Sequence, residues 1–283
     1  MSLMRKTVIV FFPLLRQGVL VSNFPWALLY LERVVRHLDI DLLLLDERLN
    51  PDYSDIIRKV KDNLLFAGVS SLLGFQIAGA IEFSKAIKSI TDAPVIWGGW
   101  VPTVFPELVL KESFVDYICV GQGEIPFRSF TERMLKGEKI SDIPGIGYKI
   151  NGEIFVNAHE KLMNPDTFPK INLSLLDIEP FIDINGKVEY GYRYMDYLAS
   201  TGCPNSCSFC NVVHFFDHRW FDKKIPEIIS DLRFLQEKAA ITHFTFSEDN
   251  FFANKKFVMN FCNEIIKSGL SFTWDAMLMW AIF

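Results

Sequence analysis

Three of the five cysteines in this chain fall within eight residues, and their spacing is the strongest chemical signal in the sequence. Cys203, Cys207 and Cys210 stand in the run CPNSCSFC, a C-x3-C-x2-C pattern. Three thiolates on one short loop can hold a metal centre, but they cannot by themselves complete a four-coordinate site. In a 4Fe–4S cluster, this shortage leaves one iron open to a ligand from outside the protein.

A zinc site and a disulfide are the alternatives to an iron–sulfur cluster at this point. His214 follows Cys210 at C-x3-H, so a closed Cys3His zinc site is possible by spacing. A disulfide would leave an odd thiol among the three clustered cysteines, and nothing in the sequence suggests secretion. Zinc loops usually belong to small domains that fold around the metal, whereas this loop follows a strand inside a large α/β pattern. We therefore favour the iron–sulfur cluster.

The same spacing, with Phe209 before the last cysteine, resembles the motif of the radical S-adenosylmethionine (SAM) superfamily. Cys203, Cys207 and Cys210 match that motif position by position. The resemblance implies that they bind a 4Fe–4S cluster, that SAM chelates the fourth iron, and that Phe209 contacts SAM. It also implies that the reduced cluster cleaves SAM to a 5′-deoxyadenosyl radical, with an electron donor such as flavodoxin or ferredoxin.

The segments around the cysteines predict the opening of a (βα) barrel. A buried strand ends at residues 197–200, and Thr201-Gly202 is expected to be the turn that leaves it. Two further strands are predicted at 242–246 and 271–274, with helices at 225–238 and 255–267. Barrel chemistry lies at the carboxyl ends of the strands, so Glu248 and Asp249 should face the same rim as the cysteines.

Glu248 and Asp249 are the candidates to hold the ammonium group of SAM. A carboxylate at a strand end can accept a charge-assisted hydrogen bond from it, and the resembled family often has an acidic residue near this place. A structural role is the alternative, in which Asp249 or Asn250 caps a helix that begins at Phe251. The sequence leaves both open.

The first half of the chain alternates apolar runs of strand length with amphipathic helical patterns, from about residue 6 to 136. Continuous apolar strands separated by helices are typical of a parallel sheet covered on both faces. We therefore predict an α/β fold with a doubly wound, Rossmann-like sheet. The predicted strands are 8–12, 41–45, 64–69, 94–97 and 117–120, and the predicted helices are 26–38, 52–61, 74–89, 104–110 and 125–135.

Small residues follow three of these strands, where a doubly wound sheet binds its ligands. Glycines there let a ligand approach the backbone closely. No G-x-G-x-x-G follows the first strand, so a dinucleotide is disfavoured. The small residues are Ser70 and Ser71 after the third strand, Gly98, Gly99 and Thr103 after the fourth, and Gly121 and Gly123 after the fifth.

This half resembles the cobalamin-binding domain that precedes many radical SAM domains. The resemblance is carried by GGWVPT at 98–103 with Pro106-Glu107, and by Val115-Asp116-Tyr117 with GQGE at 121–124. It lacks the D-x-H-x-x-G loop of mutase-type domains, so no protein histidine is expected on cobalt. The resemblance implies that the corrin and its nucleotide tail are lined by Ser70, Ser71, Gly98, Gly99, Thr103, Gly121 and Gly123.

Composition narrows the class of protein. The 283 residues are 50% hydrophobic, and the formal net charge is −5, so a broad basic surface for nucleic acid is absent. No apolar run is long enough to span a membrane, and the clustered cysteines suit a reducing cytoplasm. Between the two halves, Asn151-Gly152 predicts a hairpin, and His159 is expected to be a surface residue.

These observations predict a cobalamin-binding domain at 1–140, a hairpin and linker at 141–193, and the N-terminal part of a radical SAM barrel at 194–283. The last part holds about two and a half βα units, whereas a closed parallel barrel needs roughly 200 residues or more. The resemblance implies a cobalamin-dependent radical SAM enzyme, or its N-terminal fragment, that methylates an unactivated carbon of a small-molecule or peptide substrate. The alternatives are a radical SAM cyclase, oxidoreductase or methylthiotransferase-like protein, and a non-catalytic cobalamin- or zinc-binding module.

Overall fold

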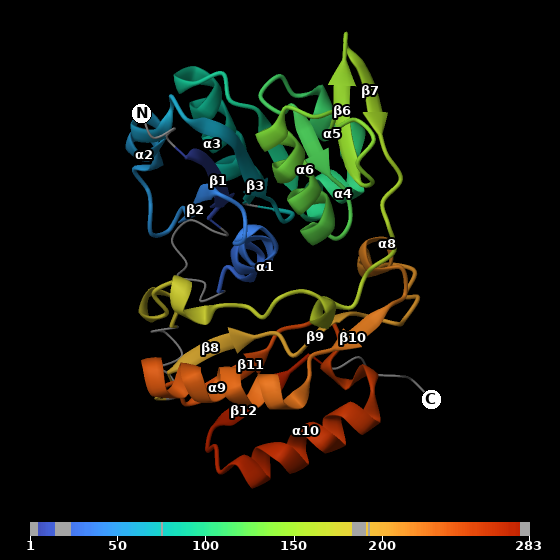
Figure 1. Cartoon of the computed structure of the whole chain (residues 1–283). Coiled ribbons are helices and arrows are strands. Elements are labelled where there is room, and N and C mark those ends of the chain that lie inside the picture. Colours follow the sequence, from blue (N-terminus) through green and yellow to red (C-terminus); the bar gives the residue numbers. More distant parts are fainter. Residues whose placement is uncertain (1–4, 15–23, 75, 183–190, 192, 278–283) are drawn as a thin grey trace. The chain divides into compact units, whose positions relative to one another are not determined.

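The computed structural model describes residues 5–14, 24–74, 76–182, 191 and 193–277 (Figure 1). The chain divides into two compact units, and each is described by itself. The described residues of the first unit are 5–14, 25–74 and 76–161. Those of the second are 24, 162–182, 191 and 193–277.

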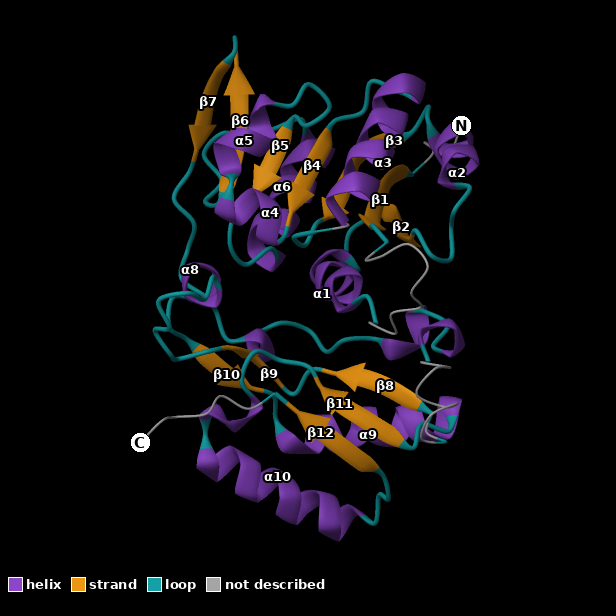
Figure 2. Ribbon diagram, turned by 180° about the vertical axis from the view of Figure 1, so that it is seen from behind, coloured by secondary structure: helices purple, strands orange, loops and turns teal. Residues whose placement is uncertain are grey.

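The first unit is built on a seven-stranded sheet with the order β2-β1-β3-β4-β5-β6-β7 (Figures 1 and 2). The five strands β1 to β5 run parallel, which confirms the predicted fold class. The strands are β1 (Lys6–Phe12), β2 (Ile40–Asp46), β3 (Leu64–Ser70), β4 (Val95–Gly98), β5 (Tyr117–Cys119), β6 (Ile146–Ile150) and β7 (Glu153–Val156). The helices are α1 (Trp26–Val35), α2 (Tyr53–Val60), α3 (Gln76–Ile90), α4 (Trp100–Val104), α5 (Pro106–Lys111) and α6 (Glu124–Lys136).

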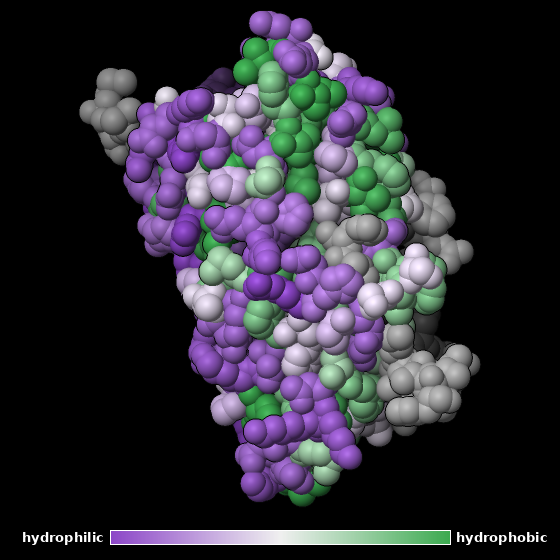
Figure 3. Space-filling model, turned by 90° about the vertical axis from the view of Figure 1, so that its right-hand side faces the viewer, coloured by the Kyte–Doolittle hydropathy of each residue, from purple (hydrophilic) through white to green (hydrophobic). Residues whose placement is uncertain are grey.

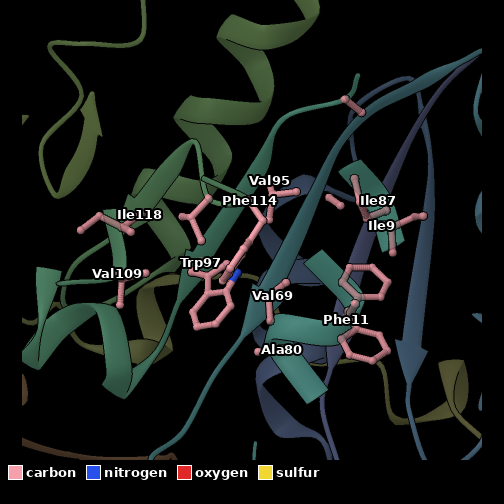
Figure 4. Close-up of a cluster of buried hydrophobic side chains, with 14 of the residues drawn as sticks. Ile9, Phe11, Val69, Ala80, Ile87, Val95, Trp97, Val109, Phe114 and Ile118 are labelled. Carbon is pink, nitrogen blue, oxygen red and sulfur yellow. The ribbon is translucent and has the colours of Figure 1, made fainter. Parts of the chain in front are cut away.

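Helices cover both faces of the parallel strands because those strands are apolar on both sides. On one face, Phe66 of β3 packs edge-on against Phe127 and Phe130 of α6. On the other face, Phe11 of β1 stacks on Phe83 of α3, with ring centroids 3.9 Å apart. Figure 4 shows the cluster on this second face, which also includes side chains of β4 and β5.

The hairpin predicted at Asn151-Gly152 extends the sheet beyond β5. Both turn residues have positive φ, 51° and 83°, as a two-residue hairpin turn requires. β6 pairs antiparallel with β5, and β7 pairs antiparallel with β6. Three apolar residues of this hairpin, Ile150, Phe155 and Val156, are exposed. Figure 3 shows exposed hydrophobic residues in this unit on the side that faces the viewer.

The second unit contains a three-stranded parallel sheet in the order β12-β11-β8 and a separate two-stranded ribbon of β9 and β10. The parallel strands are packed against aromatic side chains, with Phe246, Phe251, Phe261 and Trp274 in mutual contact. From residue 194 onward its elements are β8 (Tyr194–Tyr197), β9 (Ser200–Gly202), α8 (Val212–Phe216), β10 (Trp220–Asp222), α9 (Ile225–Ala239), β11 (His243–Phe246), η4 (Phe251–Ala253), α10 (Lys255–Ser268) and β12 (Thr273–Ala276).

Two predicted elements differ from the structure. The helix expected at 104–110 is α5, which begins only at Pro106, and α4 is a separate helix before it that was not predicted; the chain leaves the helical region between them at Phe105 (φ −128°, ψ 55°). The turn expected at Thr201-Gly202 is part of β9, which pairs antiparallel with β10. The cysteines therefore follow a ribbon strand, one step beyond the parallel strand β8.

Candidate functional site

In the first unit, hydrogen bonds join the carboxyl ends of β3, β4 and β5. The backbone N–H of Ser71 donates to the carbonyl of Gly98 at 2.9 Å. The hydroxyl of Thr103 donates to the carbonyl of Gly99 at 2.7 Å and accepts from the N–H of Gly121 at 3.0 Å. Five of the residues predicted from the strand ends are thus brought together, and Ser70 and Gly123 adjoin them along the chain.

Gly99 is the tightest point of this network. Its backbone has φ 95° and ψ −157°, a conformation that is essentially restricted to glycine. A Cβ atom added there would lie 2.7 Å from the carbonyl oxygen of Ser71, which belongs to backbone and cannot rotate away. The chain segments that follow β3 and β4 therefore meet backbone to backbone at Gly99.

A buried ion pair holds the Gly121–Gly123 loop. Arg33 of α1 and Glu124, the first residue of α6, lie 2.7 Å apart, with side chains only 5% and 10% exposed. Buried charges need such a partner, because an unpaired one costs several kcal/mol. Glu124 follows the loop directly, so the pair ties this strand end to α1. The sequence does not predict this pairing, because a contact between helices 91 residues apart leaves no local pattern.

His159 and Cys119 also lie near these strand ends. His159 is exposed, as expected, and its ring atoms lie 3.2 Å from the place where a Cβ on Gly121 would stand. Cys119 is buried at the end of β5, and burial raises the pKa of its thiol to about 12. A thiol that stays protonated at neutral pH is a poor nucleophile or ligand, so Cys119 belongs to the core.

In the second unit, the three cysteines follow β9 on one loop. Cys203 is buried, whereas Cys207 and Cys210 are half-buried and joined by a tight turn from Cys210 N–H to the Cys207 carbonyl at 3.0 Å. Phe209 is 89% exposed. Within the described residues, no three His, Cys, Asp or Glu side chains are gathered as a metal-binding group. The side chain of His214, which the zinc alternative needs, lies outside what the structure describes.

The three cysteine thiols nevertheless fit an iron–sulfur cluster whose binding would draw the ligand side chains together. A metal site need not exist before the metal binds, because binding and local folding are coupled. The sulfur of Cys203 already accepts hydrogen bonds from the side-chain amides of Asn205 at 3.5 Å and Asn250 at 3.9 Å. Hydrogen-bond donors to the sulfur commonly surround a ligating cysteine.

Glu248, at the end of β11, is a buried carboxyl group with one oxygen unused. Its Oε1 accepts hydrogen bonds from the Ala199 N–H at 3.2 Å and the Ser200 hydroxyl at 3.3 Å. Its Oε2 is buried and has no hydrogen-bond partner among the described residues. Burial raises the pKa of Glu248 to about 7, against a smaller lowering by its hydrogen bonds. Such a group is suited to receive a cation.

Asp249 and Asn250 do not share this arrangement. Asp249 is exposed as a residue, although burial around its carboxyl group raises the pKa of that group above its ordinary value. Asn250 stands just before η4, but its side chain makes no capping hydrogen bond there, so the prediction of a helix cap is wrong for this residue. The side-chain cap in this region belongs to Asn254, which accepts from the N–H groups of Lys256 and Phe257 in α10.

Both halves of the chain are similar to known proteins. Residues 20–131 match the family model of the B12 binding domain. An uncharacterized methyltransferase of Pyrococcus horikoshii is 28% identical over 258 residues, covering 89% of this chain and 54% of the relative. Anaerobic magnesium-protoporphyrin IX monomethyl ester cyclase of Synechocystis sp. is 22% identical over 180 residues, covering 63% of this chain and 35% of the cyclase.

The fold matches solved structures as well. The radical S-adenosylmethionine methyltransferase TsrM from Kitasatospora setae, solved with cobalamin and a [4Fe-4S] cluster bound, superposes with a TM-score of 0.70 at 16% identity. The match covers 93% of this chain and 51% of TsrM. The chain thus spans about half the length, or less, of the proteins it matches. The resemblance predicted from the sequence, a radical SAM fold behind a cobalamin-binding domain, is confirmed at the level of the fold.

The helices of the two units are short or amphipathic. Among the described residues, none combines the length and the apolar character needed to cross a lipid bilayer.

Proposed function

We propose that this chain, which has the fold of the cobalamin-binding radical SAM enzymes, belongs to such an enzyme and contributes to methylation of an unactivated carbon. The observation that carries the proposal is that a three-cysteine loop after β9 and a buried carboxyl group, Glu248, after β11 lie in one unit, where the Asn250–Cys203 hydrogen bond joins the two segments. When bound, the cluster supplies the electron that cleaves SAM, and cobalamin supplies the methyl group.

In this proposal, the residues of the second unit bind and orient the cluster and SAM. Cys203, Cys207 and Cys210 ligate three irons, and their number leaves one iron open for SAM. Glu248 accepts a hydrogen bond from the SAM ammonium through its unused Oε2, and Phe209 and Asp249 complete the contacts. The raised pKa of Glu248 supports this role, because a carboxyl group kept neutral by burial ionises when a cation arrives.

The strand ends of the first unit are proposed to bind cobalamin. Ser70, Ser71, Gly98, Gly99 and Thr103, with the Gly121 and Gly123 loop, offer backbone groups without bulky side chains, so a large flat ligand can approach. The proposal assigns residues 1–140 to cobalamin binding, 141–193 to the hairpin and linker, and 194–283 to the radical SAM barrel. It also includes a small-molecule or peptide substrate, an electron donor such as flavodoxin or ferredoxin, and a cytoplasmic location.

Anaerobic reconstitution of the purified chain with iron and sulfide tests the proposal. We expect about four irons and four sulfides per chain, and retention of added cobalamin through gel filtration. One zinc with no iron would instead identify the closed zinc site and a binding module. A cyclase is the second candidate, favoured by the match to the Synechocystis enzyme. Transfer of the SAM methyl carbon to the product separates methylation from cyclisation.

Replacing Gly99 by alanine tests the cobalamin site. The new Cβ would lie 2.7 Å from the Ser71 carbonyl, so β3 and β4 must separate, and the strained φ adds a cost of about 1–3 kcal/mol. We expect cobalamin retention, measured from its visible absorption, to fall about tenfold or more, because about 1.4 kcal/mol already corresponds to tenfold. Gly74→Ala is the matched control, since Gly74 also has positive φ (88°) but meets no atom within 4 Å. Equal retention by G99A and G74A would contradict the site.

A further inference from the structure

One of the three cysteines is distinguished from the others by its surroundings. Cys203 is the buried member of the trio, and two side-chain amides converge on its sulfur. The Nδ2 atoms of Asn205 and Asn250 lie 3.5 Å and 3.9 Å from the sulfur, and each is oriented to donate to it. Asn205 belongs to the cysteine loop, whereas Asn250 comes from the segment that follows β11, 47 residues along the chain.

The side chain of Asn250 is turned toward this sulfur and away from the helix that follows it. An asparagine before a short helix ordinarily accepts a hydrogen bond from the first turn, but Asn250 makes no such cap on η4. Asn250 is only 5% exposed. A buried side-chain amide needs a hydrogen-bond acceptor, because an unsatisfied N–H donor costs about 1–3 kcal/mol. The sulfur of Cys203 accepts the hydrogen bond from the Asn250 amide. The segment is therefore arranged so that a buried N–H meets this sulfur.

We propose that Asn250, assisted by Asn205, is a positioning residue that sets the reduction potential of a cluster ligated through Cys203. The inference rests on the proposed function, since it requires the cysteine loop to hold a 4Fe–4S cluster. A hydrogen bond to a ligand sulfur draws electron density from the cluster and stabilises the more negative, reduced form. Reduction transfers one electron from the reductant to the cluster, and the amides keep their protons throughout. Both amides therefore raise the potential and make the cluster easier to reduce.

The test is a redox titration of the reconstituted full chain with dithionite, followed by electron paramagnetic resonance of the reduced cluster. Asn250→Leu removes the donor at nearly constant volume. We expect it to reduce the equilibrium constant for reduction about tenfold, which for one electron is a midpoint more negative by about 59 mV. Asn205→Leu should shift the midpoint in the same direction. Asn260→Leu, the same substitution at an exposed position of α10, should leave it unchanged.

The outcomes separate this inference from the proposed function. An intact cluster in N250L with the wild-type midpoint overturns the inference and leaves the proposed function standing. A wild-type chain that assembles no cluster overturns the proposed function, and the inference with it.

A second measurement covers the case in which N250L does not fold. Wild-type protein is grown with asparagine labelled with ¹⁵N only in the side-chain amide, and pulsed electron paramagnetic resonance is recorded on the reduced cluster. We expect a weak ¹⁵N coupling, because the amide nitrogens lie 3.5 Å and 3.9 Å from a ligand sulfur. Absence of any such coupling contradicts the proposed contact.

Discussion

Replacing Cys203, Cys207 or Cys210 by alanine, one at a time, should abolish assembly of a four-iron cluster. Each thiolate is expected to hold a different iron, and two remaining protein ligands leave a cubane open at two corners. Iron and sulfide content after anaerobic reconstitution should fall to background in each variant, together with the visible absorption of the cluster. The loss should be near complete, because metal binding gathers the ligands and each missing ligand weakens the closure of the loop.

Cys262→Ala provides the matched control. Cys262 is a half-buried thiol of α10, outside the cysteine loop, so its removal changes the total number of cysteines without touching the trio. We expect wild-type iron content in this variant. Cluster content that survives removal of any one cysteine of the trio, or that falls equally in C262A, would rule out the proposed ligand set.

The parallel strands of the first unit could be predicted closely because a strand buried on both faces is a continuous apolar run in the sequence. β1 is buried from Thr7 to Phe12 without interruption, and such a continuous apolar run of strand length is typical of a central parallel strand. The observed ends of the strands and of most helices differ from the predicted ends by at most three residues, because the ends depend on hydrogen bonds to distant backbone groups. The break at Phe105 could have been expected, since Pro106 restricts the residue before it.

The strand β9 could not be predicted in the same way. Gly202 has φ 86°, and a Cβ there would lie 2.2 Å from the carbonyl oxygen of Arg219. A glycine next to a threonine suggests a turn when only the local sequence is considered. Here the glycine is needed because the backbone of Arg219, the residue just before β10, lies directly against it. A glycine is thus required at position 202 by a contact with a segment about 17 positions further along the chain. No periodic pattern in the sequence indicates such a contact.

The sequence identified residue types at the candidate site, but not the atoms that meet. The sequence predicted that the cysteines and Glu248 each follow a strand. In the structure these strands are β9 of the ribbon and β11 of the parallel sheet, and a shared rim stays a prediction. The hydrogen bonds from Asn250 to Cys203 and from Ala199 to Glu248 join segments 47 and 49 residues apart. Hydrophobic patterns specify which face of an element is buried, and they carry no information about which polar groups pair across that face.

Replacing Glu248 by glutamine should make the cofactor-free protein more stable at neutral pH while weakening its binding of SAM. The folded-state pKa of Glu248 is raised from 4.5 to about 7, chiefly by burial. The stability contributed by the protonated carboxyl is therefore fully present below pH 4.5 and is lost as the pH rises to about 7. At about 1.4 kcal/mol per pKa unit, the loss amounts to a few kcal/mol.

Glutamine does not titrate, so E248Q should lack this part of the pH dependence. Denaturant unfolding at several pH values should show similar stabilities for the two proteins near pH 4.5. The advantage of E248Q should then grow up to about pH 7 and stay constant above it. Parallel curves for the two proteins across that interval would mean that Glu248 does not titrate within it.

SAM binding should change in the opposite direction in the same variant. The ionised carboxylate is the form that attracts an ammonium group, so the affinity of the reconstituted wild-type chain for SAM should rise as the pH passes about 7. E248Q should lose that rise and about 1.5–3 kcal/mol of binding free energy, roughly ten- to a hundredfold in Kd. Asp249→Asn is the comparison variant, because Asp249 is an exposed residue that is proposed only as an additional SAM contact, so its loss should weaken SAM binding less. If D249N loses SAM and E248Q keeps it, the ammonium contact belongs to Asp249, and the buried carboxyl serves only to fasten β11 to the strand that leads to Cys203.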